Sequence, residues 1–383
     1  MAQEAVSVVT QEEPRLPPSN VVYLIGSGLT NATAFRVKHG SEMVMNALFG
    51  EIVPKLRDDD KIAKDPITGP LINRLSELSE SQSAPNLEEL IDLLESSGRE
   101  ACIRMSEKLS STFADVLLNH VKRLINDLPE NLAEVLLDLH SRSDSPEKLV
   151  GIITTNYDTL IEIAIQSIGY YINYGFETRF NEGKSIVLLK LHGSIDWEQS
   201  VPIGLRELSD IKTGEGRAWI GPRRLKVASQ YPFDLIWGKA RELLCKADTI
   251  RIIGCSLLPS DWHIAQLLFR TSILDSQGRH RKIEIVNRGK ECERIQNAYP
   301  MLDLVPIYRI DEVVRNVRAG DGKPWGDPIG LEHIQKAKDF LWDSKNPVEY
   351  WLQSEVQMLL NNRMSIDTEK GRLRAFADNR SST

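Results

Sequence analysis

The sequence contains no apolar run that approaches the ~20 residues needed to cross a lipid bilayer. Its four cysteines are isolated and form no Cys-x-x-Cys pair, which argues against a structural zinc site and against a disulfide framework. The formal net charge is −7, and basic residues gather only in short runs such as Arg223-Arg224. Because nucleic acids and anionic membranes attract basic surfaces, direct binding to either is not expected. The acidic N-terminal segment lacks the apolar core of a secretory signal, so we expect a cytoplasmic protein.

What the sequence does contain is typical of a globular α/β protein. A chain of 383 residues exceeds one ordinary single-core domain, so we expect a large domain with an insertion or extension. Six short apolar runs, mostly β-branched, predict strands that are buried on both faces. We therefore predict a Rossmann-like parallel sheet with helices on both faces, in a strand order that the pattern leaves open. The runs are Val21–Ile25, Leu149–Ile153, Ile186–Leu191, Thr249–Ile253, Ile283–Val286 and, more weakly, Val305–Ile310.

The segment between the first two runs is far longer than one crossover helix. Within it, Asn86 is a candidate helix N-cap, and Leu87, Leu90 and Ile91 follow with helical spacing. We predict that this segment is a helical subdomain inserted into the sheet domain, and that further helices follow a glycine- and proline-rich linker near Gly320. The predicted division is a disordered tail at 1–18, a Rossmann-like domain at 19–40 and 147–311, the helical insertion at 41–146, and a C-terminal helical extension at 312–383.

Small or polar residues follow most of the predicted strands directly. In open α/β sheets, ligands bind beyond the carboxyl ends of the strands, so these loops are the predicted functional region. The segment 194–223 is expected to form a long loop over the same strand ends. Two loops carry groups suited to catalysis, the carboxamide of Asn156 and the imidazole of His192. The five loops are Gly26-Ser27-Gly28, Thr154-Thr155-Asn156, His192-Gly193-Ser194, Gly254-Cys255-Ser256 and Asn287-Arg288-Gly289.

Each loop also has a structural explanation when it is considered alone. The glycines of the first loop suit a turn whose N–H groups face a phosphate, and they equally suit a tight turn without a ligand. Asn31 holds the position of the third glycine of the dinucleotide fingerprint. No predicted strand that ends in an acidic residue follows about 20 positions later, which counts against a hydride-transfer enzyme. His192 could be a structural residue at a strand end. Asn156 could cap the following helix, and Asp158 could interact with the dipole of that helix.

Together, the five loops resemble the motifs of the Sir2 (sirtuin-like) superfamily. Gly26-Ser27-Gly28 resembles its Gly-x-Gly loop, and Thr154-Thr155-Asn156-Tyr157-Asp158 is similar to its Thr-Gln-Asn-x-Asp motif. His192-Gly193 resembles the catalytic His-Gly. Gly254-Cys255-Ser256 resembles the Gly-Thr-Ser motif, and Val286-Asn287 resembles the late Val-Asn motif. The motifs occur in the family's order, each at the end of a predicted strand.

The sequence departs from sirtuin deacylases in three places. Ser27 stands where alanine is usual. Those enzymes carry four zinc cysteines between the His-Gly and Gly-Thr-Ser motifs, and here Cys245 is alone in that interval. Their Gly-Ile-Pro-x-Phe-Arg segment is not recognisable between Asn31 and Arg36. The chain therefore looks like the zinc-free branch of Sir2-like domains found in bacterial anti-phage systems.

That resemblance implies an NAD glycohydrolase that depletes cellular NAD, with NAD as its substrate and no zinc or other metal. Asn156 would hold a ribose hydroxyl or the attacking water, and His192 would accept a proton. Asp158 would bind the nicotinamide carboxamide. Of the remaining predicted NAD-binding residues, Gly26, Ser27, Gly28 and Ser256 would cradle the diphosphate, Asn287 would hold the adenine ribose, and Thr155 and Gly254 complete the set.

Two alternatives stay open at this level. The first is an NAD-dependent protein deacylase or ADP-ribosyltransferase, and the second is a non-catalytic nucleotide-binding scaffold subunit. An ungated NAD hydrolase would be toxic, so we expect control by homo-oligomerisation through the helical regions or by a partner. The resemblance implies a separate partner protein, with a HerA-type ATPase as the first expectation.

Overall fold

The structure is a computed structural model. The predicted tail at 1–18 and the predicted helical extension at 312–383 lie outside the residues that it describes. The described residues are 19–36, 45–80, 86–127, 133, 137, 147–176, 184–200, 203–207, 210–211, 217–222, 230–272, 281–287 and 289–308.

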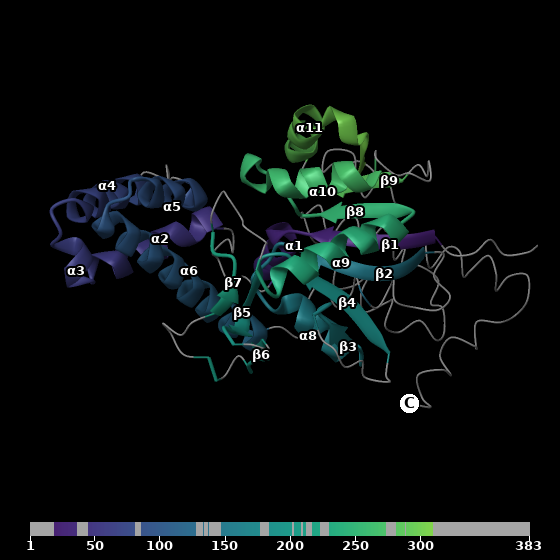
Figure 1. The fold of residues 1–383 in the computed structure, drawn as a ribbon, viewed down its shortest axis with the longest axis horizontal. Helices are drawn as coiled ribbons and strands as arrows, with labels where there is room; N and C mark the ends of the chain where they lie inside the picture. The colour runs from purple at the N-terminus through teal and green to yellow at the C-terminus, as the bar shows by residue number, and fades with distance from the viewer. Residues whose placement is uncertain are drawn as a thin grey trace, which may run out of the picture.

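A seven-stranded sheet in the order β10-β9-β8-β1-β2-β4-β3 forms the centre of the structure, flanked by helices (Figure 1). Every strand pair in it is parallel, so the predicted Rossmann-like parallel sheet is confirmed. The six predicted runs are all strands of this sheet, and the three-residue strand β3 was not predicted. The strands are β1 (Ser19–Ile25), β2 (Glu147–Thr154), β3 (Tyr171–Asn173), β4 (Ser185–Lys190), β8 (Thr249–Ile253), β9 (Lys282–Val286) and β10 (Leu304–Tyr308).

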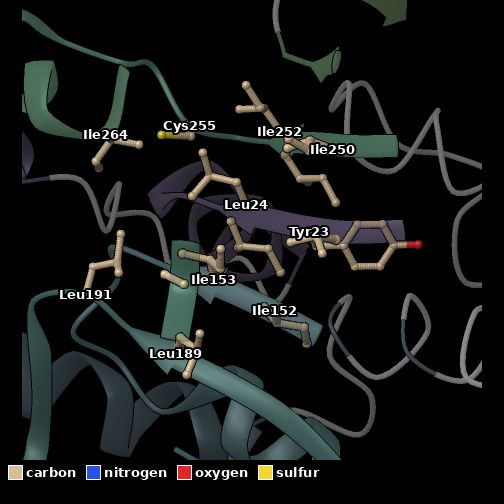
Figure 2. Packing of buried hydrophobic residues seen from close by; sticks show 14 of the residues in the cluster. Tyr23, Leu24, Ile152, Ile153, Leu189, Leu191, Ile250, Ile252, Cys255 and Ile264 are labelled. Atoms are coloured by element: carbon tan, nitrogen blue, oxygen red, sulfur yellow. The ribbon is translucent and has the colours of Figure 1, made fainter. Parts of the chain in front are cut away.

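The central strands carry the main hydrophobic core. Leu24, Ile153 and Ile252 come from three adjacent strands, and each is at most 2% exposed. Figure 2 shows these strands with their apolar side chains packed together. Burial of apolar area on both faces of a strand explains the near-continuous apolar runs in the sequence. The helices on this sheet are α1 (Ser27–Arg36), α8 (Leu160–Ser167), α9 (Phe233–Lys246), α10 (Trp262–Ser272) and α11 (Gly289–Ala298), with short 3₁₀ helices η1 (Pro259–Asp261) and η2 (Pro300–Leu302).

The helices between β1 and β2 form a second hydrophobic cluster, seen on the left of Figure 1. Helix α5 begins where the sequence predicts, because Asn86 Oδ1 accepts a hydrogen bond of 2.9 Å from the Glu88 N–H. The cluster extends to Tyr157 and Ile195, so it contacts the loops that follow β2 and β4. Among the described residues, no helix has the length and apolar character of a membrane crossing. The helices are α2 (Met45–Arg57), α3 (Asp60–Ala63), α4 (Thr68–Glu80), α5 (Leu87–Ser96) and α6 (Glu100–Asp127).

A small antiparallel sheet in the order β6-β5-β7 occupies part of the segment predicted to be a long loop. Its strands are β5 (Gly193–Glu198), β6 (Gly204–Leu205) and β7 (Arg217–Trp219). The prediction of an irregular loop was wrong for these residues, because β6 and β7 are too short to give a periodic signal and the polar residues of β5 suggested an exposed segment. Gly193 has φ +81°, and a Cβ there would lie 2.4 Å from the Ala218 carbonyl oxygen. Glycine is therefore required where the chain turns from His192 into β5.

Candidate functional site

The carboxyl ends of five parallel strands lie at one level of the sheet. Ile25 pairs with Thr154 on one side and with Ile253 on the other. Thr154 pairs in turn with Lys190, and Ile253 pairs with Val286. All five predicted loops therefore leave the sheet along one edge. The ladder continues for one more residue, since the N–H groups of Gly26, Thr155, Leu191 and Gly254 donate to the carbonyls of Ile253, Ile25, Thr154 and Val286.

Asn156 and His192 occupy matching positions on neighbouring strands. Each lies two residues beyond the paired residues Thr154 and Lys190. The His192 carbonyl accepts a 2.8 Å hydrogen bond from the Ile220 N–H, and the Ile220 carbonyl accepts one of 2.8 Å from the Tyr157 hydroxyl. The Tyr157 and His192 rings lie 5.9 Å apart between centroids. The fold thus brings the two predicted catalytic residues together.

The hydrogen bonds of Asn156 fix the orientation of its carboxamide. Nδ2 donates to the Gly26 carbonyl at 3.1 Å and to Thr30 Oγ1 at 3.0 Å. A carbonyl can only accept, so the NH₂ group must face Gly26. Both N–H bonds are then engaged, and Oδ1 is the atom that can accept from a ligand. Helix α8 begins at Leu160 without a contribution from this carboxamide, so the helix-cap alternative for Asn156 was wrong.

Thr30 connects Asn156 to Asp158. Its buried hydroxyl accepts from Asn156 and donates to Asp158 Oδ2 at 2.7 Å. The other Asp158 oxygen, Oδ1, accepts from the Leu160 N–H at 3.1 Å, which holds the first turn of α8. Both carboxylate oxygens of Asp158 therefore have a role within the fold. Thr30 was not among the predicted site residues, although its place two residues after Gly28 is a sequence signal that points to the same loop.

The buried side chain of Lys190 binds both the backbone at Asp158 and the carboxylate of Glu162. Lys190 Nζ donates to the Asp158 carbonyl and, at 2.5 Å, to Glu162 Oε1. The Lys190 side chain is 0% exposed and that of Glu162 is 6% exposed. Burial raises the pKa of Glu162 to about 7, because loss of solvent penalises the carboxylate more than Lys190 stabilises it. Lys190 therefore joins the end of β4 to the loop after β2 and to α8. These are the segments next to His192 and Asn156.

The glycines of the first and fourth loops allow two backbones to touch. The Gly28 N–H donates to the Gly254 carbonyl at 2.8 Å. A Cβ on Gly28 would lie 2.5 Å from the Gly254 Cα, and one on Gly26 would lie 2.6 Å from the Cys255 Cα. The loop–loop contact explains these glycines without a ligand. The same contact places Ser27, the exposed first residue of α1, at the edge of the sheet, where helix N–H groups can face an anion.

These two loops also lie where the strand order reverses. From β1 the chain moves to β2 and β4 on one side, and β8 then returns to the other side of β1. Ligands of open α/β sheets bind at such a reversal. Within the fourth loop, the Cys255 carbonyl accepts from Asn287 Nδ2 at 3.2 Å, and the Ser256 carbonyl accepts from Arg294 Nη2. The Asn287 carboxamide therefore holds this loop in place, and Ser256 and Thr155 are partly exposed at the edge.

Three residues that the sequence did not point to, His263, Asp261 and Trp237, lie around His192. His263, in the first turn of α10, has its ring centroid 5.8 Å from that of His192. One nitrogen of each histidine and a carboxylate oxygen of Asp261 all lie within 4.8 Å of one another. Trp237 contacts the backbone just before His192 and the ring of His263. Its Nε1 donates to the Leu191 carbonyl at 3.1 Å, and its ring centroid lies 5.2 Å from that of His263. None of the three directly follows a predicted strand, so the strand-end pattern could not find them.

Tyr157 is unsuited to acid–base chemistry despite its place beside His192. Burial raises its pKa well above the usual value, and the charges of Glu88 and Asp261 raise it further. The hydroxyl stays protonated at ordinary pH and donates to the Ile220 carbonyl. The ring also lies 5.1 Å from that of Trp219, edge to face. Tyr157 is therefore a packing residue that holds the backbone around His192.

Comparison with protein families gives one match, to the SIR2-like domain, over residues 150–300. The match supports the Sir2-like superfamily. The matched residues contain four of the five loops, including those with Asn156 and His192. The glycine loop after β1 lies outside the match and contacts the matched residues through Gly26 and Gly28, which touch the fourth loop.

Solved structures of Sir2 proteins align with most of this chain at low similarity. One is a complex of a Sir2 homologue with NAD, 18% identical, covering 78% of this chain and 90% of that chain with a TM-score of 0.38. Another is a Sir2 protein bound to an acetylated peptide, 17% identical, covering 79% of this chain and 93% of that chain with a TM-score of 0.35. No curated protein shows significant sequence similarity to the chain. The SIR2-like domain match and the site geometry therefore carry the functional inference.

Proposed function

We propose that the chain hydrolyses NAD to nicotinamide and ADP-ribose, with Asn156 and His192 as its catalytic residues. The observation that carries this proposal is their shared position, two residues beyond paired positions on adjacent parallel strands. The match to a SIR2-like domain supports NAD as the substrate. The chemistry breaks the bond between nicotinamide and the ribose and forms a bond between the ribose and a water oxygen. Nicotinamide leaves as a neutral molecule, and one proton is released.

The transition state of such a cleavage carries positive charge on the ribose, so the enzyme mainly positions and stabilises. Asn156 offers Oδ1, because both N–H bonds of its carboxamide are held by Gly26 and Thr30. This oxygen accepts a hydrogen bond from the attacking water or from a ribose hydroxyl. His192 takes the proton that the water or the hydroxyl loses, which is a suitable role for an imidazole near neutral pH.

The remaining residues bind the rest of NAD in this proposal. Gly26, Ser27 and Gly28 place the N-terminus of α1 against the diphosphate, with Ser256 on the opposite loop. Asn287 reaches the adenine ribose, and Gly254 and Thr155 complete the binding loops. Asp158 contacts the nicotinamide carboxamide while it keeps its hydrogen bonds to Thr30 and Leu160.

The sequence resemblance supports a proposal for the biological role. We propose a cytoplasmic enzyme that depletes NAD during anti-phage defence, as a homo-oligomer gated by a partner of the HerA ATPase type. The alternative activities, protein deacylation and ADP-ribosyl transfer, need an acceptor or an acylated peptide. Hydrolysis needs only water, and this difference separates the candidates.

The test is chromatography of NAD incubated with the full chain, alone and with a HerA-type ATPase encoded beside it. We expect nicotinamide and ADP-ribose to appear in equal amounts without any peptide. His192→Ala and Asn156→Ala should each abolish nicotinamide release. The matched control is His120→Gln, which removes a buried histidine on α6 that is paired with Glu51 at 2.7 Å.

If turnover requires an acylated peptide, the assigned activity would be deacylation and not hydrolysis. NAD binding without turnover, even with the partner present, would support the scaffold alternative. Full activity in both the His192 and the Asn156 variant would end the assignment of the catalytic pair.

A further inference from the structure

His192, Asp261 and His263 form a compact group of potential ligands at the carboxyl edge of the sheet. Each offers one nitrogen or oxygen atom, and these three atoms lie within 4.8 Å of one another. His192 comes from the turn between β4 and β5, Asp261 is the last residue of η1, and His263 lies in the first turn of α10. The three residues thus come from two segments that are far apart in the sequence and meet only in the folded chain.

The residue types favour one class of cation. Imidazole nitrogens suit zinc, copper, nickel and iron, whereas magnesium and calcium prefer an all-oxygen shell. Two histidines and one carboxylate are a ligand set of mononuclear sites that keep a position open for water or substrate. In a tetrahedral zinc site with bonds of about 2.0–2.1 Å, ligand atoms lie about 3.3 Å apart. The three ligand atoms, which lie within 4.8 Å of one another, would have to move closer on binding, and Asp261 and His263 are only half-buried.

We propose that His192, Asp261 and His263 bind one divalent transition-metal ion of the zinc class. The proposal extends beyond NAD hydrolysis, because binding needs only the three side chains. It also differs from a cysteine zinc module, since none of the three ligands is a thiolate.

The surroundings contact all three ligand residues. Trp237 donates through Nε1 to the carbonyl of Leu191, the residue before His192, and its ring packs 5.2 Å from His263. The His192 backbone is held on the other side by the Ile220 N–H. Asp261 is anchored by its own N–H, which donates to the Leu258 carbonyl at 2.8 Å. These contacts fix the backbone at His192 and Asp261 and pack against the His263 ring, so the segments that carry the three side chains are held in place.

Metal binding has a consequence for catalysis that rests on the proposed function. If His192 is the proton acceptor in NAD hydrolysis, a coordinated metal occupies the lone pair that would take the proton. A bound zinc ion should then inhibit hydrolysis, and a chelator should restore it. The metal would act on the site as a reversible inhibitor.

The first experiment measures binding without NAD. The full chain is stripped with a chelator and titrated with Co²⁺, followed by visible absorption, and separately with Zn²⁺ by calorimetry. We expect one ion per chain, d–d absorption bands without a thiolate charge-transfer band, and displacement of Co²⁺ by Zn²⁺. Asp261→Asn and His263→Gln should each weaken binding by more than about 100-fold, the upper end of the loss for an outer-shell partner. His120→Gln is the matched control and should bind as the parent chain does.

Circular dichroism and thermal melting establish whether each variant is folded. Because Asp261 and His263 are only half-buried, we expect both variants to fold, and either one alone is sufficient for the test. Unchanged affinity in both folded variants, a thiolate-dominated cobalt spectrum, or no binding by the parent chain would overturn the metal site. The second experiment adds Zn²⁺ during NAD hydrolysis. Binding without any NAD turnover by the stripped chain would overturn the proposed function and keep the metal site. Hydrolysis at full rate with the ion bound would refute the role of His192 as the proton acceptor.

Discussion

Thr30 Oγ1 accepts a hydrogen bond of 3.0 Å from Nδ2 of Asn156, although 126 residues separate the two. The first helix after β1 therefore sets the direction in which a carboxamide after β2 points. The same hydroxyl donates to Asp158, so a single threonine orients two side chains of the predicted NAD site. Thr30 itself is buried and acts through these neighbours, which makes it a positioning residue.

Replacement of Thr30 tests this relationship. Thr30→Val removes the hydroxyl and leaves Asn156 Nδ2 and Asp158 Oδ2 each short of one partner. We expect a loss of about 1–3 kcal/mol in the free energy of unfolding. We also expect roughly a tenfold to hundredfold fall in kcat for nicotinamide release, of the size that small misplacements of a catalytic group produce. Thr30→Ser keeps the hydroxyl and should restore most of the rate. Equal losses in both variants would show that packing, and not orientation, is the role of this residue.

Gly254 and Gly98 form a matched pair for the loop–loop contact. Both have positive φ, +58° and +64°, but a Cβ on Gly254 would lie 2.7 Å from the Gly28 Cα, whereas a Cβ on Gly98 has no neighbour within 4 Å. Gly98→Ala should cost only the left-handed backbone penalty, about 1 kcal/mol. Gly254→Ala should cost about 3 kcal/mol more, because two backbones must separate. Urea denaturation of both variants gives the comparison. Equal costs would contradict the close approach of the two loops.

Glu162 predicts a specific pH dependence of stability. Its pKa is raised from 4.5 to about 7 by burial, so the folded state favours the protonated form. This contribution to stability is fully present below pH 4.5 and is lost as the pH rises through about 7. Relative to Glu162→Gln, the parent chain should lose about 3 kcal/mol across this interval. Denaturation at several pH values measures the difference, and the exposed Glu198→Gln serves as the control. A difference that does not change with pH would refute the raised pKa.

Tyr157→Phe separates packing from chemistry. The variant loses the 2.8 Å hydrogen bond from the hydroxyl to the Ile220 carbonyl, which should lower stability by about 1 kcal/mol. Because the raised pKa keeps this hydroxyl protonated, its removal should leave the shape of the pH–rate profile for nicotinamide release unchanged. A profile that loses one limb in the phenylalanine variant would assign an acid–base role to Tyr157.

The central sheet could be predicted from the sequence because its strands are buried on both faces. A run such as Thr249–Ile253 has no other common explanation at that length. Strand β3 has only three residues, and β5 alternates apolar residues with Ser194 and Asp196, which the fold nevertheless buries. Their burial depends on elements that pack over them, which local periodicity does not contain. The strand order likewise depends on long-range pairing.

The position of a candidate site residue could be predicted where it follows a strand directly. Asn156 and His192 are of this kind, and the parallel register places each of them two residues beyond a paired position on neighbouring strands. Thr30 and His263 lie on helices, and only the tertiary contacts show their relation to the site. The sequence also could not decide between a cap and a ligand-facing role for Asn156. The hydrogen bonds to Gly26 and Thr30 exclude the cap.

The place of β1 in the sheet has a consequence for synthesis of the chain. This strand is translated first, but its partners β2 and β8 follow only at Glu147–Thr154 and Thr249–Ile253. At bacterial-like elongation speeds of about 5–20 residues per second, the first glycine loop waits roughly 10–45 s for Gly254 to emerge. The helices between them have local contacts and can fold during that delay. A growing chain therefore has no complete site, and the proposed activity towards NAD is deferred until β8 and then β9, with Asn287 after it, have left the ribosome.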